Sequence, residues 1–137
     1  MTSAHHQQSR ELDFIKKILN GVFQTRKRLA RIAGTDAAER SLEAIEEAFL
    51  SEYPSPTIGF VLLDPIGEKY ADTRSDVQAS LAGESNVNLR IVETMKPIIS
   101  MRTTTPDGAV TSIIIQQGIV VVRGDNEANQ SSIRNTP

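Results

Sequence analysis

The sequence has 137 residues, a formal net charge of −2 and 39% hydrophobic residues, which allows one domain or two small ones with a modest core. It contains no cysteine, which excludes disulfides, thiolate metal sites and a cysteine nucleophile, and its charge gives no overall basic field for nucleic acid. No apolar run approaches the ~18 residues needed to span a bilayer, and residues 1–8 lack the apolar core of a signal peptide, so we expect a cytoplasmic protein outside the membrane.

A first helix is expected between Ser9 and Ala33. The polar residues 1–8 are expected to form a disordered lead-in, and Ser9 is a plausible N-cap. Apolar residues then recur at steps of three and four, which is the spacing of one helix face. Gly34 follows at the place where a C′ glycine commonly ends a helix.

A second helix is expected after a short loop. Asp36 and Glu39 have the spacing of a capping box, and Pro54 and Pro56 end the helix because proline has no amide donor and disfavours helix before it. In such a hairpin each helix exposes more apolar surface than the other covers, so we expect two copies of the chain to form a four-helix bundle. The residues expected at this dimer interface are Leu12, Ile15, Leu19, Val22, Leu42, Ile45 and Phe49.

Residues 57–123 are expected to form a small all-β domain of short strands. Strand-like runs lie at residues 57–63, 77–81, 87–91, 98–103, 110–115 and 119–122, with turn residues between them. Pro106-Asp107-Gly108 is the clearest hairpin signal, and the polar residues 124–137 are expected to be a disordered tail. The sequence therefore predicts an α+β fold, in which a helical hairpin over residues 9–56 dimerises and precedes the β-domain.

The sequence offers few groups for catalysis. Its two histidines, His5 and His6, lie in the lead-in, and without cysteine the usual nucleophile–base pairs are unavailable to it. Four acidic residues lie close together in the sequence: Asp64, Glu68, Asp72 and Asp76. Two of them could form an acid–base pair or a hard-metal site, but we favour roles in turns and caps. We therefore expect no enzymatic activity, no metal and no cofactor.

Several stretches of the chain carry a resemblance to one family. Residues 14–19 (FIKKIL) through 28–30 (RLA) resemble the first bundle helix, and residues 41–46 (SLEAIE) the second helix, of the GrpE family, the nucleotide exchange factors of DnaK-type chaperones. Residues 63–70 (LDPIGEKY) are the best match, since they are similar to the Ile-x-Pro-x-Gly-Glu-x-Phe stretch that joins bundle and β-domain in that family. Residues 89–93 and 118–122 resemble its later strands.

The resemblance implies a homodimeric co-chaperone without cofactor, nucleic acid or membrane. Its partner would be the nucleotide-binding domain of a DnaK-type chaperone, from which it would promote the release of ADP. The residues that the resemblance places at the partner surface are Glu43, Ala44, Glu47, Arg90, Lys96 and Gln116. For the glutamates, a plain solvated helix face is the alternative interpretation.

The sequence also departs from the family pattern. Only residues 1–9 precede the bundle, where the family has a long helix; Gln116 stands in place of an arginine, and Ala44 in place of a glycine. These departures leave a second hypothesis, a GrpE-fold adaptor without exchange activity. A third and least favoured hypothesis is a sugar-binding or hydrolytic β-domain that uses the four clustered carboxylates.

Overall fold

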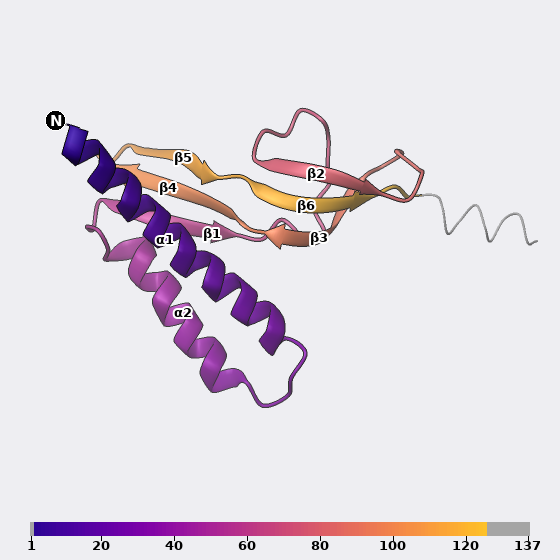
Figure 1. Ribbon diagram of the computed structural model, residues 1–137, viewed down its shortest axis with the longest axis horizontal. Helices are drawn as coiled ribbons and strands as arrows, with labels where there is room; N and C mark the ends of the chain where they lie inside the picture. The colour runs from indigo at the N-terminus through magenta and orange to yellow at the C-terminus, as the bar shows by residue number, and fades with distance from the viewer. Residues whose placement is uncertain (1, 126–137) are drawn as a thin grey trace, which may run out of the picture. The chain divides into compact units, whose positions relative to one another are not determined.

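The computed structural model describes residues 2–125, with side chains from Ser9 onward. It has the expected α+β class: α1 (Thr2–Leu29) and α2 (Asp36–Ser51) precede six strands (Figure 1). The strands are β1 (Ile58–Leu63), β2 (Val77–Ala82), β3 (Arg90–Lys96), β4 (Ile98–Thr104), β5 (Val110–Gln116) and β6 (Gly118–Arg123). They form two three-stranded sheets, with the strand orders β1-β4-β5 and β2-β6-β3.

The described chain divides into two compact units, with boundaries after Leu62, Ile98 and Gln116. One, which we call the helix–sheet unit, holds α1, α2 and the sheet β1-β4-β5; the other, the sheet unit, holds the sheet β2-β6-β3. The expected boundary at residue 56 does separate the helices from the strands along the sequence. It does not separate the compact units, because three of the strands fold together with the helices.

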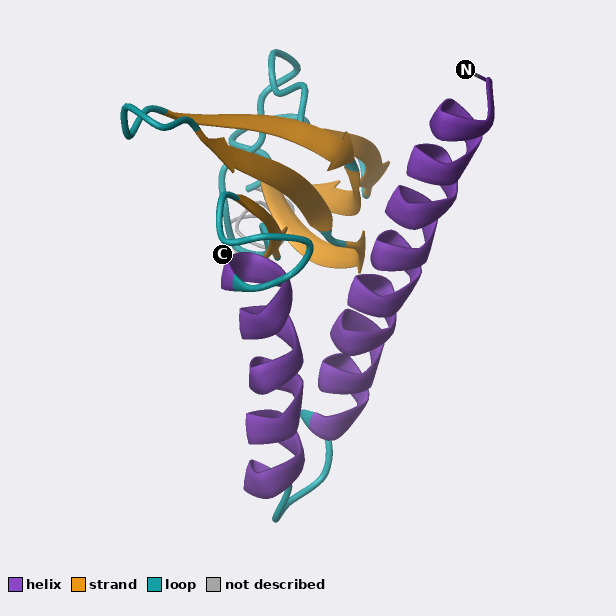
Figure 2. Cartoon of the chain, turned by 90° about the vertical axis from the view of Figure 1, so that its left-hand side faces the viewer, coloured by secondary structure: helices purple, strands orange, loops and turns teal. Residues whose placement is uncertain are grey.

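The helix–sheet unit is built on the apolar face of α1. The two helices run antiparallel and meet at the loop that joins them (Figure 2). Ile15 and Leu19 of α1 are buried together with Phe60 of β1 and Ile99 of β4. Each such side chain contributes roughly 1.5–3 kcal/mol when it leaves water. Half-buried residues packed around this core are Leu12, Phe49, Leu62, Met101 and Ile115.

The sheet unit has β6 at its centre. β2 pairs with β6 in parallel and β3 pairs with it antiparallel. Its core consists of β-branched side chains, which suit a pleated surface: Val77, Ile91, Ile98, Val120 and Val122. Gly118 lies opposite Val77, and a Cβ atom at Gly118 would approach the side chains of Ile98 and Val77 to 3.0 and 3.2 Å. Glycine is therefore the residue that lets these strands approach.

The helices differ from the expected bounds at three ends. α1 begins at Thr2, so the expected disorder of residues 1–8 is wrong for all but Met1, which lies outside the described residues. The reason is that no glycine or proline interrupts these residues, so the helix extends through them at small cost. α1 ends at Leu29, short of Ala33. The N-cap of α2 is Thr35, and its side chain makes no capping hydrogen bond, so the capping box is not formed as expected.

The strands lie close to their expected places. The hairpin at residues 106–108 is confirmed, since β4 and β5 pair antiparallel and Gly108 has a φ of 89°. The third strand begins at Arg90 rather than at residue 87, because Asn88 adopts a left-handed conformation with a φ of 52°. Of the expected tail, Gly124 and Asp125 are described, and the amide of Asp125 donates to the carbonyl of Val87 at 2.7 Å; residues 126–137 lie outside the described part.

Neither helix of the described chain combines the length and the apolar character that crossing a membrane requires.

Candidate functional site

The helix–sheet unit contains a groove lined on one side by acidic residues. Glu43, Glu46, Glu47 and Leu50 of α2 line it because steps of three, four and seven residues fall on one helix face. The other walls are Leu19 of α1 and the β1 residues Phe60, Val61 and Leu62. The cavity measures about 270 Å³. We call it the acidic groove; it combines an apolar floor with a carboxylate rim.

One of the three glutamates of the acidic groove is neutralised within the chain. Nη1 of Arg26 on α1 lies 2.7 Å from Oε1 of Glu46. This hydrogen bond, together with the charges of Glu46, Glu43 and Glu39, raises the pKa of the Arg26 guanidinium above its ordinary value. Glu43 and Glu47 are exposed, and no ion pair joins either to a cation among residues 9–125. The groove therefore presents net negative charge.

Ala44 lies on α2 between the two exposed glutamates in sequence. Its side chain is exposed, so a larger side chain can be placed there without disturbing the core. Three of the expected partner residues, Glu43, Ala44 and Glu47, thus lie close together on α2, and all three are exposed.

The other three expected partner residues lie on β3 and at the end of β5. Arg90 and Lys96 are exposed at opposite ends of β3 in the sheet unit. Gln116 belongs to the helix–sheet unit, where it is half-buried and exchanges side-chain hydrogen bonds with Asn20 of α1. A partner surface around these residues therefore stays a prediction, and Gln116 also has a structural role because its hydrogen bonds hold a helix to a strand.

The expected dimer interface is also revised. Ile15, Leu19 and Val22 are only 1%, 1% and 4% exposed within a single chain, so they have no surface to offer a second copy. Leu12 and Phe49 are half-buried around the same core. Ile15 and Leu19 are buried because the sheet β1-β4-β5 packs on them through Phe60 and Ile99. Leu42 is half-buried, and Ile45 is 40% exposed.

The clustered carboxylates have structural partners. Arg74 donates to both carboxylate oxygens of Asp76, at 2.9 and 2.8 Å, and to Glu68 at 3.1 Å. Asp64 accepts the amide of Ile66, as a turn residue does. Within the described residues no group of three or more potential ligands could hold a metal ion. Ion pairing and turn formation therefore account for three of these four acidic residues.

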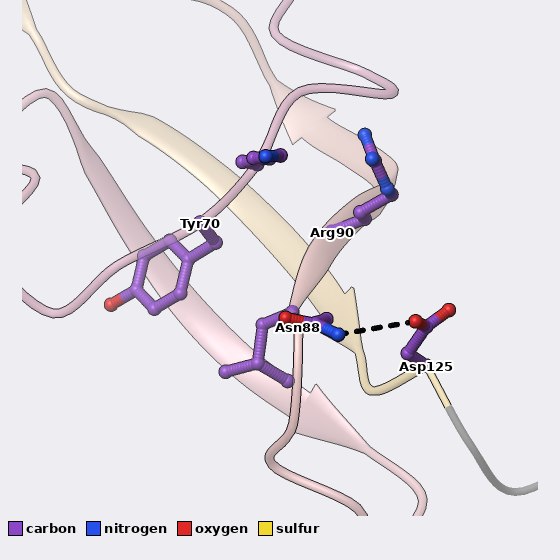
Figure 3. A pocket seen from close by; sticks show the side chains of 6 residues that line it. Tyr70, Asn88, Arg90 and Asp125 are labelled. Carbon is purple, nitrogen blue, oxygen red and sulfur yellow. Dashed lines mark hydrogen bonds between the residues drawn. The ribbon is translucent and has the colours of Figure 1, made fainter.

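A second pocket lies in the sheet unit, and sequence reasoning missed it. Its volume is about 330 Å³, and it is lined by Lys69, Tyr70, Asn88, Leu89, Arg90 and Asp125 (Figure 3). These residues come from three segments that are distant in sequence. Only Arg90 was among the expected site residues, and no periodicity in the sequence connects it with Lys69. The signal that joins them is the strand pairing, which appears only in the fold.

Comparison of the chain with models of protein families, with curated proteins and with solved structures found no match.

Proposed function

We propose that the chain is a GrpE-like co-chaperone that binds the nucleotide-binding domain of a DnaK-type chaperone and promotes the release of ADP. The order of elements supports this proposal, since two antiparallel helices precede a set of short strands, as the resemblance implies. The segment at residues 63–70, the best match to the family, leads from β1 into the sheet unit.

The observation that carries the proposal is the exposed face of α2. Glu43 and Glu47 are exposed beside the acidic groove, and Ala44 leaves room for a partner to approach. Interfaces gain orientation and association rate from complementary charge, so the partner surface that fits here carries lysine or arginine side chains around an apolar contact. These are the residues of α2 that the resemblance places at the partner surface.

An exchange factor needs no catalytic group. A protein that binds the open form of a nucleotide cleft better than the closed form shifts the equilibrium toward the open form, by as much as its two affinities differ. Moving the chaperone from 99% closed to 99% open takes about 5.5 kcal/mol of differential binding. An interface of ordinary size can supply this difference, and the nucleotide then leaves the open cleft.

The proposal includes a homodimer formed through the helices. The apolar side chains still available on the helices favour it: Phe14 is 61% exposed and Ile45 is 40% exposed. Two copies that bury these side chains against each other would remove them from water. The four-helix arrangement is part of the proposal, with Phe14, Leu42 and Ile45 replacing the buried residues of α1 as the contacts.

The test is the release of a fluorescent ADP analogue from a DnaK-type chaperone of the same cell, with and without the chain. We expect faster release at stoichiometric amounts, and we expect Ala44→Asp to abolish the acceleration while the fold remains intact. Ala37→Asp is the matched control, because Ala37 is an exposed alanine in the first turn of α2.

The outcomes of this test separate the hypotheses. Binding without faster release would replace the proposal with the adaptor hypothesis. If the chain neither binds the chaperone nor accelerates the release of ADP, both hypotheses are rejected. Equal activity of the Ala44→Asp variant and the wild type would show that the contact surface is placed wrongly.

A further inference from the structure

The second pocket, in the sheet unit, is framed by backbone hydrogen bonds. The stretch before β2 pairs with the start of β3: the amide of Tyr70 donates to the carbonyl of Leu89, and the amide of Ile91 donates to the carbonyl of Glu68, both at 2.9 Å. On the other side, the amide of Asp125 bonds to Val87. Because these backbone hydrogen bonds already order the residues around the pocket, ligand binding would cost little free energy for ordering them.

Two cationic residues lie at directly opposite positions on the paired segments that line the pocket. Lys69 and Arg90 form an antiparallel bridge pair, and like charges at directly opposite positions destabilise a strand pair. No carboxylate forms an ion pair with either residue in the part of the chain from Ser9 to Asp125. The guanidinium of Arg90 donates instead to the carbonyl of Gly67, at 3.3 Å. The two side chains therefore repel each other, and a bound anion would reduce this repulsion.

The opposite wall of the pocket supplies polar groups of another kind. Nδ2 of Asn88 donates to Oδ2 of Asp125 at 3.3 Å (Figure 3). This bond uses one of the two oxygens of the carboxylate, and the other can accept a hydrogen bond from a hydroxyl group. Tyr70, which packs against the core of the sheet unit, adds an aromatic ring to the lining of the pocket.

We propose that this pocket binds the phosphate group of a small, hydroxylated phosphomonoester. A phosphate has enough acceptor oxygens to engage Lys69 and Arg90 together, and an arginine with a lysine is a common phosphate-binding combination. Asp125 would accept a hydroxyl group of the same ligand. A volume of about 330 Å³ lies in the range of pockets for small molecules, which favours a small ligand over an acidic protein segment.

The binding site does not rest on the proposed co-chaperone function. Of its residues only Arg90 is shared with the proposed partner surface, and the experiment needs no chaperone. A failure of one proposal therefore leaves the other standing.

The experiment is an NMR titration of the ¹⁵N-labelled full chain with glycerol 3-phosphate, at constant ionic strength. Saturable shifts are expected for the amides of residues 68–70 and 88–91. Lys69→Gln and Arg90→Gln should each weaken binding roughly tenfold, since each removes one charge-assisted hydrogen bond. Asp125→Asn should tighten the binding of inorganic phosphate, because it removes a negative charge near the bound anion.

Lys96→Gln is the matched control, since it makes the same change of charge at the other end of β3 and does not line the pocket. Equal weakening by Lys96→Gln would mean a general charge effect and would overturn the proposal. Shifts that grow without saturating would also overturn it. If sodium acetate or a glutamate-rich peptide binds as well as glycerol 3-phosphate, the pocket recognises carboxylates and the proposal of phosphate recognition is wrong. The dispersed spectrum of each variant reports whether it remains folded.

Discussion

The side-chain amides of Asn20 and Gln116 exchange two hydrogen bonds. Nδ2 of Asn20 donates to Oε1 of Gln116 at 2.9 Å, and Nε2 of Gln116 donates to Oδ1 of Asn20 at 2.8 Å. Asn20 lies in the middle of α1 and Gln116 ends β5, so the pair ties the helix to an edge of the sheet β1-β4-β5. Both residues are half-buried, and each amide satisfies the other where water has limited access.

Removing either amide should destabilise the helix–sheet unit. Gln116→Ala leaves the amide of Asn20 without this partner, and we expect the free energy of unfolding to fall by about 1–2 kcal/mol. Asn20→Ala should have a similar effect. In urea denaturation the double variant should lose less than the sum of the two single losses, because the pair can be broken only once. Strictly additive losses would contradict a coupled pair.

Gly59 of β1 packs directly against the backbone of α2. A Cβ atom at Gly59 would overlap the carbonyl oxygen of Leu50, and a backbone carbonyl cannot move aside as a side chain can. We expect Gly59→Ala to lower the free energy of unfolding by about 3 kcal/mol or more, measured by thermal or urea denaturation. An unchanged stability would mean that α2 and β1 do not approach this closely.

At Gly21 the same substitution by alanine should raise the free energy of unfolding instead of lowering it. It lies inside α1, is exposed, and has nothing within 4 Å of an added Cβ atom. Alanine loses less backbone freedom than glycine in a helix, so Gly21→Ala should stabilise the chain by about 0.5–1 kcal/mol. Destabilisation by Gly21→Ala would instead indicate that another chain packs closely against this part of α1.

The sequence predicts the local elements well because their signals are local. The hairpin at residues 106–108 and the end of α2 before Pro54 follow from turn residues and from proline chemistry. The start of α1 was missed because polar residues without a breaker are compatible with both helix and coil. The division into units was missed for another reason: Ile98 and Ile99 are neighbours in sequence but belong to different cores.

The candidate sites also differ in whether local sequence signals or only the fold brings their residues together. Glu43, Ala44 and Glu47 could be placed together from the sequence because helical spacing is regular. The burial of Ile15 and Leu19 could not, since an apolar helix face does not specify whether a sheet or a second chain covers it. The bridge between Lys69 and Arg90 depends on strand pairing between segments about twenty residues apart, which no periodicity encodes.

Arg74 and Asp76 make the stability of the sheet unit depend on pH. Their bidentate contact lowers the pKa of the Asp76 carboxyl below its ordinary value. A group with a lowered pKa in the folded state stabilises the fold above its unfolded pKa and loses this contribution as the pH falls through the folded value. The side chain of Asp76 is 30% exposed, so we expect a contribution of only ~0.5–1 kcal/mol.

Urea denaturation over a series from about pH 6 to pH 3 measures this contribution. The wild type should lose more stability over the acid part of the series than Asp76→Asn, which cannot titrate. Asp72→Asn is the control, because Asp72 is exposed and lies in the same loop. Identical pH profiles for the wild type and Asp76→Asn would rule out the assigned role.

The proposed dimer predicts that Ile45 and Phe14 are protected between two chains. Ile45→Glu and Phe14→Glu should each raise the dimer dissociation constant roughly tenfold or more, since each places a charge where an apolar side chain was buried. Sedimentation equilibrium measures the change. Ile113→Glu is the control, since Ile113 is 56% exposed on β5, outside the proposed interface. A monomeric wild type would reject the dimer.

The acidic groove makes the last prediction, which concerns electrostatics. Glu43 and Glu47 are exposed and form no ion pair among residues 9–125, so their carboxylates can attract a basic partner surface. Glu43→Lys combined with Glu47→Lys should slow association with a DnaK-type chaperone roughly tenfold at low salt, with a smaller effect at high salt, because complementary charge acts mainly on the association rate.

The control for this prediction is Glu52→Lys, which makes the same charge reversal on an exposed residue just beyond α2, outside the groove. It should leave the association rate nearly unchanged. Stopped-flow binding at two salt concentrations measures both. Equal effects at the two sites would assign the attraction to net charge, whereas a salt-independent loss for the groove variant alone would mean that the glutamates act through direct contacts at close range.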